Sequence, residues 1–436
     1  MQMKISGDRL TGTVHIPSSK SHVHRLLMAA AFATTPCDIA ISSWSEDIEV
    51  TKNCLNALGS QITYDEKNSL LHVIPMDIDH ITPINKVETD IFCRESGSTL
   101  RFLLPVIGAL GVTCRVDGAG RLPERPIGIL LDEMKAHGVE FSADTLPLTL
   151  QNQMSGGRFS LAGNVSSQFI TGLLFALSLL KVDSEIVLTS PLESKTYVDM
   201  TIEVMELFGI SVEVTETGYK IKGGQLYTAP QKIVAEGDWS SACFWVVGGC
   251  CVKNSNILLT GISENSVQGD KKIIELMRKM GGNITKEGDG LRCQYTDSMQ
   301  GIDIDVSQIP DAVPILATAG ALAKGTMHMH EAARVRIKES DRLLAMKEGL
   351  AALAVTVSDT EDTLTVTGST VASEATNVVE LDGFADHRIV MSLAIATVGL
   401  GRESMISTAE AIGKSYPRFF EDFRALGGVA DVIDVR

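Results

Sequence analysis

The sequence lacks any apolar run long enough to cross a membrane, which would take about 20 residues in a helix. Its longest candidate, ACFWVVGGCCV, is interrupted by glycines. The first residues, MQMKISGD, show neither the basic start nor the apolar stretch of a secretory signal. We therefore expect a protein that neither spans a membrane nor is secreted, and we place it in the cytoplasm.

Cysteine motifs and nucleotide-binding loops are also missing. The eight cysteines show no repeated C-x-x-C spacing and several lie in apolar runs, which indicates reduced, buried thiols rather than a metal or disulfide framework. The chain has no G-x-x-x-x-G-K-[ST] loop and no G-x-G-x-x-G motif after a strand. His328 and His330 would share one face of a strand, but two histidines without a third ligand rarely bind zinc. The sequence therefore favours no metal site, and a bound phosphate would be held by scattered cations and helix ends.

Positive charge is scarce, and its scarcity excludes further classes of function. The 436 residues carry 38 Lys and Arg against 54 Asp and Glu, which gives a net charge of −16. Such an acidic chain is unsuited to non-specific binding of DNA or of anionic membrane surfaces. With 44% hydrophobic residues, the chain is long enough for two sizeable cores. Strand-like and helix-like segments alternate throughout, which predicts an α/β or α+β class.

The sequence does contain an internal repeat. Six times a strand-like stretch leads through a polar joint into an apolar, often alanine-rich helix. The joints are PSSKSHVHR, RESGSTLR, VSSQFITG, GDWSSACF, IPDAVPIL and ADHRIVMS, which begin near residues 17, 94, 165, 237, 309 and 385. A spacing of about 70 to 77 residues suits a unit of strands and two helices. We therefore expect three such units in each of two domains.

The helices after these joints are apolar almost all round, as in FITGLLFALSLL and VPILATAGALA, so we expect them to be buried. Their first N–H groups need partners, and Ser, Asp or Gly at the joints could serve only as caps. Alternatively, several helix N-termini face one cleft and bind anions. Cations at the helix starts favour this alternative, because the helix dipole disfavours them there unless an anion is bound. These cations are Lys20, Arg25, Arg94, Arg101 and Arg388.

Further cations stand in loops and near predicted helix starts. Arg125 lies in the proline-broken loop GRLPERPIG, where it could instead form a surface pair with Glu124 or Glu133. Lys338 and Arg342 are four residues apart and would share a face of a helix, although a solvated helix of mixed charge would look similar. Both segments therefore offer anion-binding cations and leave a purely structural alternative open.

Candidate acids and bases accompany the cations. Asp311 stands at a predicted helix start, where it could cap the helix or take a proton from a ligand. Glu339 lies between two cations, which would keep it ionised until an anion is bound, or it could form a structural salt bridge. His387 stands at another helix start. Lys414 precedes Ser415, a predicted N-cap, and so repeats the arrangement of Lys20.

Together these motifs resemble the family of 5-enolpyruvylshikimate-3-phosphate synthases. PSSKS, SSQF, LPERPIG, SKTY, IKESDRL and DHR form the resemblance, which covers essentially the whole chain. It implies a two-domain inside-out barrel, in which each domain has three βαβαββ units whose buried helices point at an interdomain cleft. It also implies transfer of the enolpyruvyl group of phosphoenolpyruvate to the 5-hydroxyl of shikimate 3-phosphate. Phosphate would leave through a tetrahedral intermediate, without a metal or an organic cofactor. We expect a monomeric transferase of chorismate and aromatic amino acid biosynthesis.

The same resemblance assigns site residues motif by motif. The catalytic residues would be Lys20, Asp311, Glu339 and His387. Asp311 would take the proton of the 5-hydroxyl and Glu339 would protonate the methylene carbon, with the reverse assignment also open. The shikimate 3-phosphate ligands would be Lys20, Ser21, Arg25, Ser166, Ser167, Gln168, Ser194, Tyr197, Asp311, Lys338 and Arg334. The phosphoenolpyruvate ligands would be Lys20, Gly97, Arg125, Gln168, Arg342, Arg388 and Lys414.

Two positions depart from the family's pattern. The usual NAGT loop reads ESGS here, so Glu95 would repel phosphoenolpyruvate unless it turns away or pairs, for example with Arg94 or Arg101. That loop also lines the glyphosate site of the family, so sensitivity to glyphosate does not follow from the resemblance. Arg334 stands where many relatives have asparagine, and it could add a phosphate contact.

The resemblance also implies the domain boundaries. Residues 1–18 and 234–436 would form a discontinuous C-terminal domain, and residues 19–233 the N-terminal domain. Spacing alone would place a single boundary near residue 230. Two rival functions stay open: the sister enolpyruvyl transferase that acts on UDP-N-acetylglucosamine, and a non-catalytic relative that only binds phosphorylated metabolites.

Overall fold

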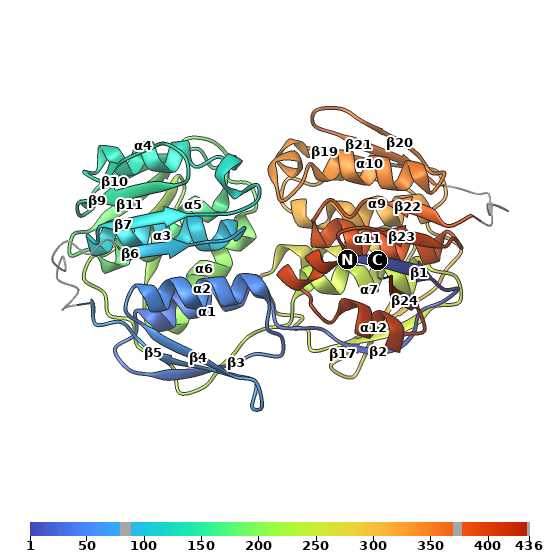
Figure 1. Ribbon diagram of the computed structural model, residues 1–436, viewed down its shortest axis with the longest axis horizontal. Coiled ribbons are helices and arrows are strands. Elements are labelled where there is room, and N and C mark those ends of the chain that lie inside the picture. Colours follow the sequence, from blue (N-terminus) through green and yellow to red (C-terminus); the bar gives the residue numbers. More distant parts are fainter. Residues whose placement is uncertain (79–88, 369–376, 434–436) are drawn as a thin grey trace. The chain divides into compact units, whose positions relative to one another are not determined.

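The computed structural model describes residues 1–78, 89–368 and 377–433 (Figure 1). The chain divides into two compact units. We call Lys20–Ala235 the N-terminal unit, and Met1–Ser19 together with Glu236–Arg436 the C-terminal unit. The chain therefore passes between the units twice, once after Ser19 and once after Ala235.

The N-terminal unit contains three four-stranded sheets of one topology. Their strand orders are β14-β3-β5-β4, β6-β7-β9-β8 and β10-β11-β13-β12. The strands are β3 (Cys37–Ala40), β4 (Gln61–Asp65), β5 (Leu70–Ile74), β6 (Thr89–Phe92), β7 (Cys114–Asp117), β8 (Glu140–Phe141), β9 (Leu148–Gln151), β10 (Arg158–Leu161), β11 (Ser184–Leu188), β12 (Val212–Thr215), β13 (Gly218–Ile221) and β14 (Ile233–Val234). The helices are α1 (Lys20–Ala31), α2 (Glu46–Ala57), α3 (Gly97–Leu110), η2 (Leu122–Glu124), α4 (Gly128–Ala136), α5 (Ser167–Leu179) and α6 (Lys195–Leu207). In each sheet the first two strands pair in parallel and the other pairs are antiparallel.

The C-terminal unit repeats this topology three more times, with strand orders β16-β17-β15-β2, β18-β19-β21-β20 and β22-β23-β1-β24. The strands are β1 (Gln2–Ser6), β2 (Thr11–His15), β15 (Asn256–Thr260), β16 (Asn283–Glu287), β17 (Gly290–Gln294), β18 (Asp303–Asp305), β19 (Thr326–His330), β20 (Thr356–Asp359), β21 (Leu364–Thr367), β22 (Val379–Leu381), β23 (Ser404–Ile406) and β24 (Val429–Ile433). The helices are α7 (Trp239–Cys251), η3 (Gly269–Lys272), α8 (Ile273–Lys279), η4 (Pro310–Ala312), α9 (Val313–Leu322), η5 (Ala333–Ile337), α10 (Arg342–Ala352), α11 (His387–Gly399), η6 (Ala409–Lys414) and α12 (Phe419–Ala425). The predicted sixfold repeat is therefore confirmed in the described residues.

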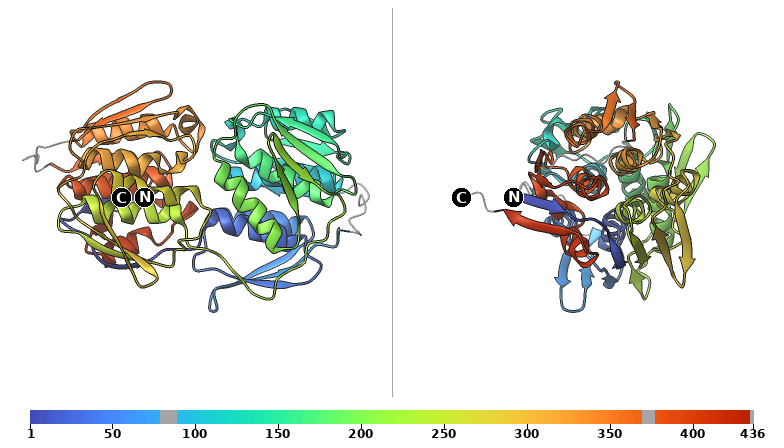
Figure 2. Two further views of the ribbon diagram at one scale, coloured as in Figure 1. Left: turned by 180° about the vertical axis from the view of Figure 1, so that it is seen from behind. Right: turned by 90° about the vertical axis from the view of Figure 1, so that its right-hand side faces the viewer.

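The apolar helices that follow the six joints lie inside their units. These helices are α1, α3, α5, α7, α9 and α11, and nearly all of their side chains are buried. In the right-hand view of Figure 2, helices of the C-terminal unit are seen end-on with strands outside them. Each unit has its own hydrophobic core. Full burial of a side chain such as Leu173 or Leu316 stabilises a fold by about 1.5–3 kcal/mol, so these helices hold the sheets around them.

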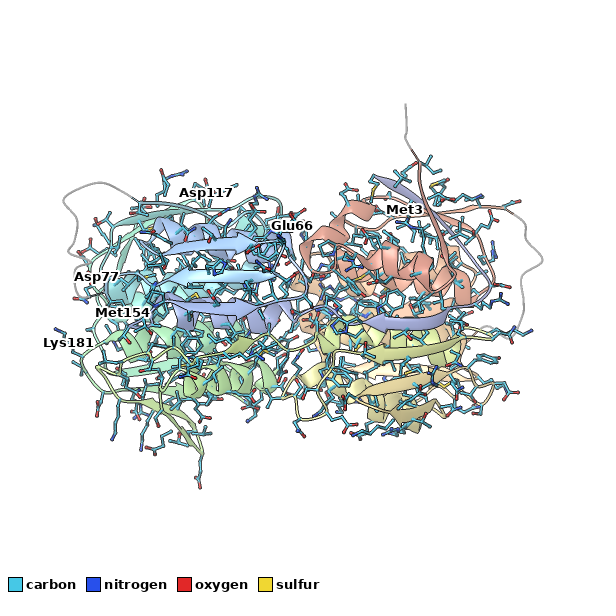
Figure 3. The ribbon with its side chains drawn as sticks, turned by 90° about the horizontal axis from the view of Figure 1, so that it is seen from below. Met3, Glu66, Asp77, Asp117, Met154 and Lys181 are labelled. Carbon is cyan, nitrogen blue, oxygen red and sulfur yellow. The ribbon has the colours of Figure 1, made fainter. Side chains whose placement is uncertain are left out.

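The first strands of the chain pair with strands from its last two hundred residues. β2 pairs in parallel with β15, and β1 pairs with both β23 and β24. Met3 on β1 is buried in the core of the C-terminal unit (Figure 3). In the same way β14, at the end of the N-terminal unit, pairs with β3 near its beginning. Each unit is thus completed by a strand from a distant part of the sequence.

None of the eight cysteines forms a disulfide, and all but Cys37 are buried, as the sequence predicts. No helix in the described part of the chain has the length and apolarity needed to span a membrane.

Candidate active site

In the N-terminal unit, Arg25 from the first predicted joint links α1 to α3 and α6. Arg25 on α1 is buried, and its guanidinium lies 5.1 Å from the centre of the Phe102 ring on α3. It donates to Thr201 Oγ1 at 2.8 Å and to the Tyr197 carbonyl at 3.0 Å, both on α6, and to the Ser21 carbonyl at 2.7 Å. Burial lowers the pKa of Arg25 to about 9, so it stays charged at neutral pH.

Lys20, the first residue of α1, forms a half-buried ion pair with Asp47. The Lys20 Nζ to Asp47 Oδ2 distance is 2.8 Å, and about 15% of each side chain is exposed. Asp47 lies in the acidic first turn of α2. The sequence analysis did not include Asp47 among the site residues. Its position two residues after Ser45, at a helix start, could have indicated it.

The N-termini of α3 and α5 meet through Gln168. The Gln168 amide donates to Ser98 Oγ at 2.8 Å, and its carbonyl oxygen accepts from Arg101 at 2.8 Å. Ser166 caps α5 by accepting from the backbone N–H of Gln168. Ser167 begins this helix, so the predicted SSQ motif lies at one helix N-terminus beside another.

Gly97 and Arg125, two predicted phosphoenolpyruvate ligands, are in direct contact. A Cβ atom at Gly97 would lie 2.5 Å from Nη1 of Arg125, so any larger residue at this position would force the guanidinium to move. The predicted alternative, a surface pair of Arg125 with Glu124 or Glu133, is not seen among the described contacts. Glu124 pairs instead with Arg121, at 3.7 Å.

Glu95 turns toward the neighbouring loop. A Cβ atom at Gly120 would overlap the Glu95 carboxylate, so the two residues pack together. The adjacent backbone fixes this arrangement, since Ala119 N–H donates to the Arg94 carbonyl at 2.7 Å. Arg101, a partner that the sequence offered for Glu95, donates to Gln168 and to the Pro126 carbonyl.

Ser194 and Tyr197 flank the start of α6. Ser194 is buried and precedes the helix with a φ of 53°, in the left-handed region. The Arg25 guanidinium lies 5.8 Å from the centre of the Tyr197 ring. Tyr197 therefore adjoins Arg25, and Ser194 immediately precedes the same helix, while Lys195 beside it pairs with Asp199 at 2.5 Å.

In the C-terminal unit, three carboxylates surround one guanidinium. Arg342 is 1% exposed and lies 2.8 Å from Asp386, 2.6 Å from Glu339 and 2.9 Å from Asp311. Burial tends to lower the pKa of Arg342, but these carboxylates outweigh it and raise the pKa above its ordinary value. Burial likewise tends to raise the pKa of Asp386, yet the charge of Arg342 keeps that pKa below the usual range. Arg342 and Asp386 thus hold each other in the ionised form.

Asp311 joins two further cations to this cluster. Its carboxylate lies 3.6 Å from Lys338 Nζ and 3.3 Å from Nη2 of Arg388, which also donates to the Asp311 carbonyl at 3.0 Å. Burial lowers the pKa of Lys338 to about 8, with Asp311 opposing the effect. Asp311 precedes α9 in η4 and makes these ion pairs, and capping of α9 through its side chain is not observed.

The other predicted residues of this unit lie close to the cluster. His387 is buried at the start of α11, with Nδ1 3.9 Å from Asp386. Lys414 Nζ donates to the Ala385 carbonyl at 3.0 Å. Arg334 lies in η5, and its charge acts to lower the pKa of Lys338.

A buried acid near the cluster was missed by the sequence analysis. Asp270 on η3 accepts a hydrogen bond from Ser240, on the first turn of α7. Burial raises its pKa to about 6, and the charges of Arg388 and Asp311 act on it in opposite directions. Nothing in the segment VQGDKK marks Asp270 as buried, because its partners lie far away in sequence.

Known proteins resemble this chain over nearly its full length. Residues 5–423 match the family described as EPSP synthase (3-phosphoshikimate 1-carboxyvinyltransferase). The 3-phosphoshikimate 1-carboxyvinyltransferase of Clostridium kluyveri is 38% identical, over 98% of this chain and 98% of its own length. The enzyme of the same name from Clostridium acetobutylicum is 39% identical, over 98% of this chain and 97% of its own. This chain belongs to the EPSP synthase family.

Solved structures agree on the fold. An EPSP synthase from Acinetobacter baumannii has a TM-score of 0.80 at 22% identity, over 99% of this chain and 100% of that one. The enolpyruvyl transferase NikO from Streptomyces tendae has a TM-score of 0.78 at 18% identity, over 99% and 98% of the two chains. The predicted family, the two-domain inside-out fold and the enzyme class are confirmed. The UDP-sugar rival is not supported, because the EPSP synthase family is the one matched.

Two details of the family motifs differ from the sequence prediction. Lys338 and Arg342 do not share a helix, because α10 begins only at Arg342, with Asp341 as its cap. Asp311 nevertheless brings the two cations together. Lys414 ends η6 and does not precede a helix capped by Ser415, since α12 begins at Phe419.

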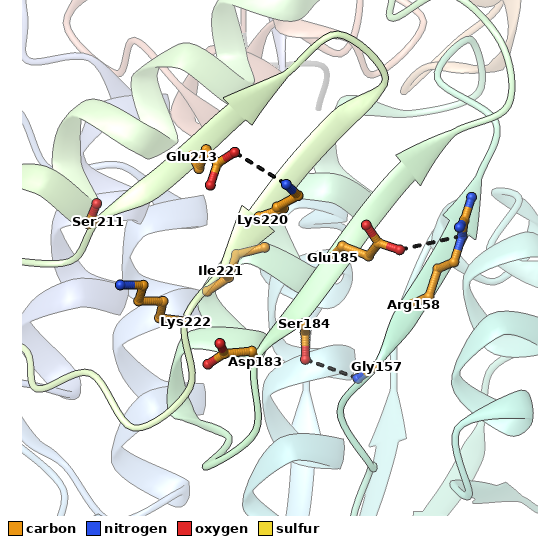
Figure 4. Close-up of a pocket in the computed structure, with 10 residues that line it drawn as sticks. All are labelled: Gly157, Arg158, Asp183, Ser184, Glu185, Ser211, Glu213, Lys220, Ile221 and Lys222. Carbon is orange, nitrogen blue, oxygen red and sulfur yellow. Dashed lines mark hydrogen bonds and ion pairs between the residues drawn. The ribbon is translucent and has the colours of Figure 1, made fainter.

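Two cavities of this family member lie apart from the predicted residues. One of about 660 Å³ is lined by the sheet that contains β10 to β13 (Figure 4). Four of its charged residues form ion pairs, Arg158 with Glu185 at 3.6 Å and Lys220 with Glu213 at 3.3 Å. The other, of about 540 Å³, lies at the C-terminal ends of α3 and α5 and includes Met154 (Figure 3). Neither cavity is lined by a predicted site residue. His328 and His330 lie on β19, and no group of three potential metal ligands occurs within the ranges described.

Proposed function

We propose that this chain is a 3-phosphoshikimate 1-carboxyvinyltransferase of the shikimate pathway. It transfers the enolpyruvyl group of phosphoenolpyruvate to the 5-hydroxyl of shikimate 3-phosphate and releases inorganic phosphate. It acts as a monomer in the cytoplasm, without a metal or an organic cofactor. The two units serve as the domains, and their boundaries after Ser19 and Ala235 lie one and two residues beyond those that the sequence implies. Residues of each unit take part in binding the substrates.

One observation carries the proposal: Asp311 and Glu339 both contact the buried guanidinium of Arg342. Two carboxylates held by one cation can take different roles once an anion competes for that cation. The carboxylate or phosphate of phosphoenolpyruvate, bound at Arg342, would displace Glu339 and favour its protonated form. Asp311 keeps Lys338 and Arg388 as partners and stays ionised.

The reaction then follows from these two roles. Glu339 protonates C3 of phosphoenolpyruvate, while Asp311 takes the proton of the 5-hydroxyl, whose oxygen adds to C2. The tetrahedral intermediate keeps its negative phosphate and carboxylate, which Arg342, Arg388 and Lys414 stabilise. Loss of a proton from the new methyl group restores the double bond and expels phosphate. His387, which lies beside Asp386, is the fourth catalytic residue of this proposal, with Lys20, Asp311 and Glu339.

The N-terminal unit binds and orients the substrates in this proposal. Its shikimate 3-phosphate ligands are Ser21, Arg25, Ser166, Ser167, Gln168, Ser194 and Tyr197, and Lys338 and Arg334 add to them from the C-terminal unit. Gly97 and Arg125 bind phosphoenolpyruvate, and Lys20 contacts both substrates. Helix N-termini and cations in one place are suited to phosphates. The contacts between Arg25, Phe102 and Tyr197 support this role because they bring α1, α3 and α6 together around one cation.

Phosphate release with each substrate alone and with both together tests the proposal. We expect release only when both are present, and loss of most of it in Glu339→Gln, since general acid catalysis contributes about 10²–10⁴-fold. Tight binding of both substrates without any phosphate release would refute catalysis and identify the chain as a binding protein.

A further inference from the structure

The two segments in which the chain passes between units lie side by side as a short ribbon. Asp238 N–H donates to the Pro17 carbonyl at 2.8 Å, and Ser19 N–H donates to the Glu236 carbonyl at 2.7 Å. Ser18 and Gly237 form an antiparallel bridge between them. All of these residues belong to the C-terminal unit.

On each segment, the next residue along is already fixed in the N-terminal unit. Ala235 N–H donates to the Ala40 carbonyl at 2.9 Å, next to the pairing of β14 with β3. Lys20 opens α1 and pairs with Asp47. The change from one unit to the other therefore takes a single peptide bond on each segment, Ser19–Lys20 and Ala235–Glu236.

One buried amide, that of Gln268, fastens the ribbon to the C-terminal unit. Its nitrogen donates to Glu236 Oε2 at 3.0 Å and to the Gly237 carbonyl at 2.8 Å. Its oxygen accepts from the backbone N–H of Trp239 at 3.0 Å and so caps α7 from outside the helix. Ser266 Oγ donates to the same Glu236 oxygen at 2.6 Å.

The ribbon has little freedom to shift away from this amide. A Cβ atom at Gly237 would overlap the Gly261 carbonyl, so the backbone packs directly against the next loop. The Trp239 indole donates to the Ser263 carbonyl at 3.1 Å, which ties the same loop to α7. Buried side-chain amides with all their groups bonded define one geometry, because any displacement leaves a polar group unsatisfied.

We propose that Gln268, acting through Glu236, is a positioning residue for Lys20. Ser19, which donates its N–H to Glu236, is joined to Lys20 by one peptide bond, so the amide of Gln268 helps to hold the residue that directly precedes Lys20. This inference rests on the proposed function for the role of Lys20 toward the substrates. Gln268 itself touches neither substrate.

Steady-state kinetics on matched variants test the proposal. Gln268→Leu removes the amide, and we expect KM for phosphoenolpyruvate to rise about tenfold, with a fall in kcat per folded molecule. Glu236→Gln keeps an oxygen that can accept from Ser266 and Gln268, and it should retain near-normal constants. Asn56→Leu is the control, because Asn56 also bonds backbone through both amide atoms, to Ile62 at 2.7 and 3.0 Å, but away from the ribbon. It should lower Tm and leave KM unchanged.

Equal KM values for Gln268→Leu and wild type, with a loss of Tm alone, would overturn the proposal. So would an Asn56→Leu variant with an equally raised KM. If Gln268→Leu does not fold, Gln268→Asn, which withdraws the amide by one methylene, takes its place with the same expected direction. Amide hydrogen exchange at Ser19 separates this proposal from the proposed function, because it needs no activity. We expect the Ser19 amide to exchange faster in the Gln268 variant than in Asn56→Leu, even if wild type releases no phosphate. Equal exchange rates at Ser19 in the two variants would refute the proposal.

Discussion

The two units hold their key cations in opposite ways. In the N-terminal unit, Arg25 is surrounded by neutral oxygens and aromatic rings, so its positive charge is not cancelled by its hydrogen-bond partners. In the C-terminal unit, Arg342 is surrounded by three carboxylates. An uncancelled buried cation is suited to hold an anionic ligand, whereas a cation shared among acids is suited to control their protonation. In the proposed function, this contrast suits Arg25 to holding a substrate anion and the cluster around Arg342 to proton transfer.

Substitution of Arg342 should have the largest effect on stability. Arg342→Met leaves Asp386, which is 0% exposed, without its cation, and breaking such a buried pair costs about 3–5 kcal/mol. Urea unfolding measures the loss. Adding Asp386→Asn should restore part of it, since the amide still caps α11 but carries no charge. A double variant no more stable than Arg342→Met alone would contradict this account.

Arg25→Met should be less destabilising than Arg342→Met, because it leaves neutral groups, rather than a buried charge, without a partner. We expect a loss of about 1–3 kcal/mol in the free energy of unfolding. Affinity for shikimate 3-phosphate should fall sharply, as titration calorimetry can measure. Arg25→Lys should not restore it, because an ammonium cannot reproduce the planar set of donors. A loss equal to that of Arg342→Met would erase the contrast between the units.

The pH dependence of stability should reveal Lys338. Its pKa is about 8 in the folded protein against an ordinary value of 10.5, so the unfolded chain binds more protons between these values. Stability contributed by Lys338 therefore rises as pH increases from about 8 toward 10.5, and the cost of its buried charge is fully present below pH 8. The free energy of unfolding of wild type relative to Lys338→Met should rise across this window. Lys181→Met, at an exposed lysine, should show no such trend, and a flat Lys338 difference would contradict the lowered pKa.

Lys20→Met should give the smallest change in stability together with loss of turnover. The substitution breaks its half-buried pair with Asp47, and the loss of such a pair costs about 1 kcal/mol or less. Turnover should be abolished, because Lys20 serves the substrates in the proposed reaction. A large fall in Tm without substrates would instead identify Lys20 as a structural residue.

Much of this architecture could be predicted, because short sequence patterns determine it. Each apolar helix follows a polar joint, so the repeat and the helix N-termini are readable from FITGLLFALSLL and its counterparts. The first residue of α10 could not be predicted, because Lys338, Glu339 and Asp341 can all stand in the first turn of a helix with charges of both signs. Asp341 decides it by accepting from the Leu344 N–H at 3.0 Å.

The partners of the site residues could not be predicted, because tertiary packing brings them together. Asp47 lies 27 residues from Lys20, and Gln268 lies 32 residues from Glu236. Neither stands in a motif, and both look like ordinary surface residues of a helix start or a loop. Local sequence fixes which residues carry charge, but only the packed sheets determine which of them are buried together.

The pairing of β1 with β24 has a consequence for synthesis and engineering. β1 and β2 are synthesised before Lys20–Ala235, yet they pair with β24 and β15, which are synthesised after it. The N-terminal unit can therefore fold during translation, whereas the C-terminal unit can fold completely only after β24 has been synthesised. Because β24 and β1 are neighbours, a short linker joining them, with new ends cut between Ala235 and Glu236, would give a circular permutant in which each half is continuous.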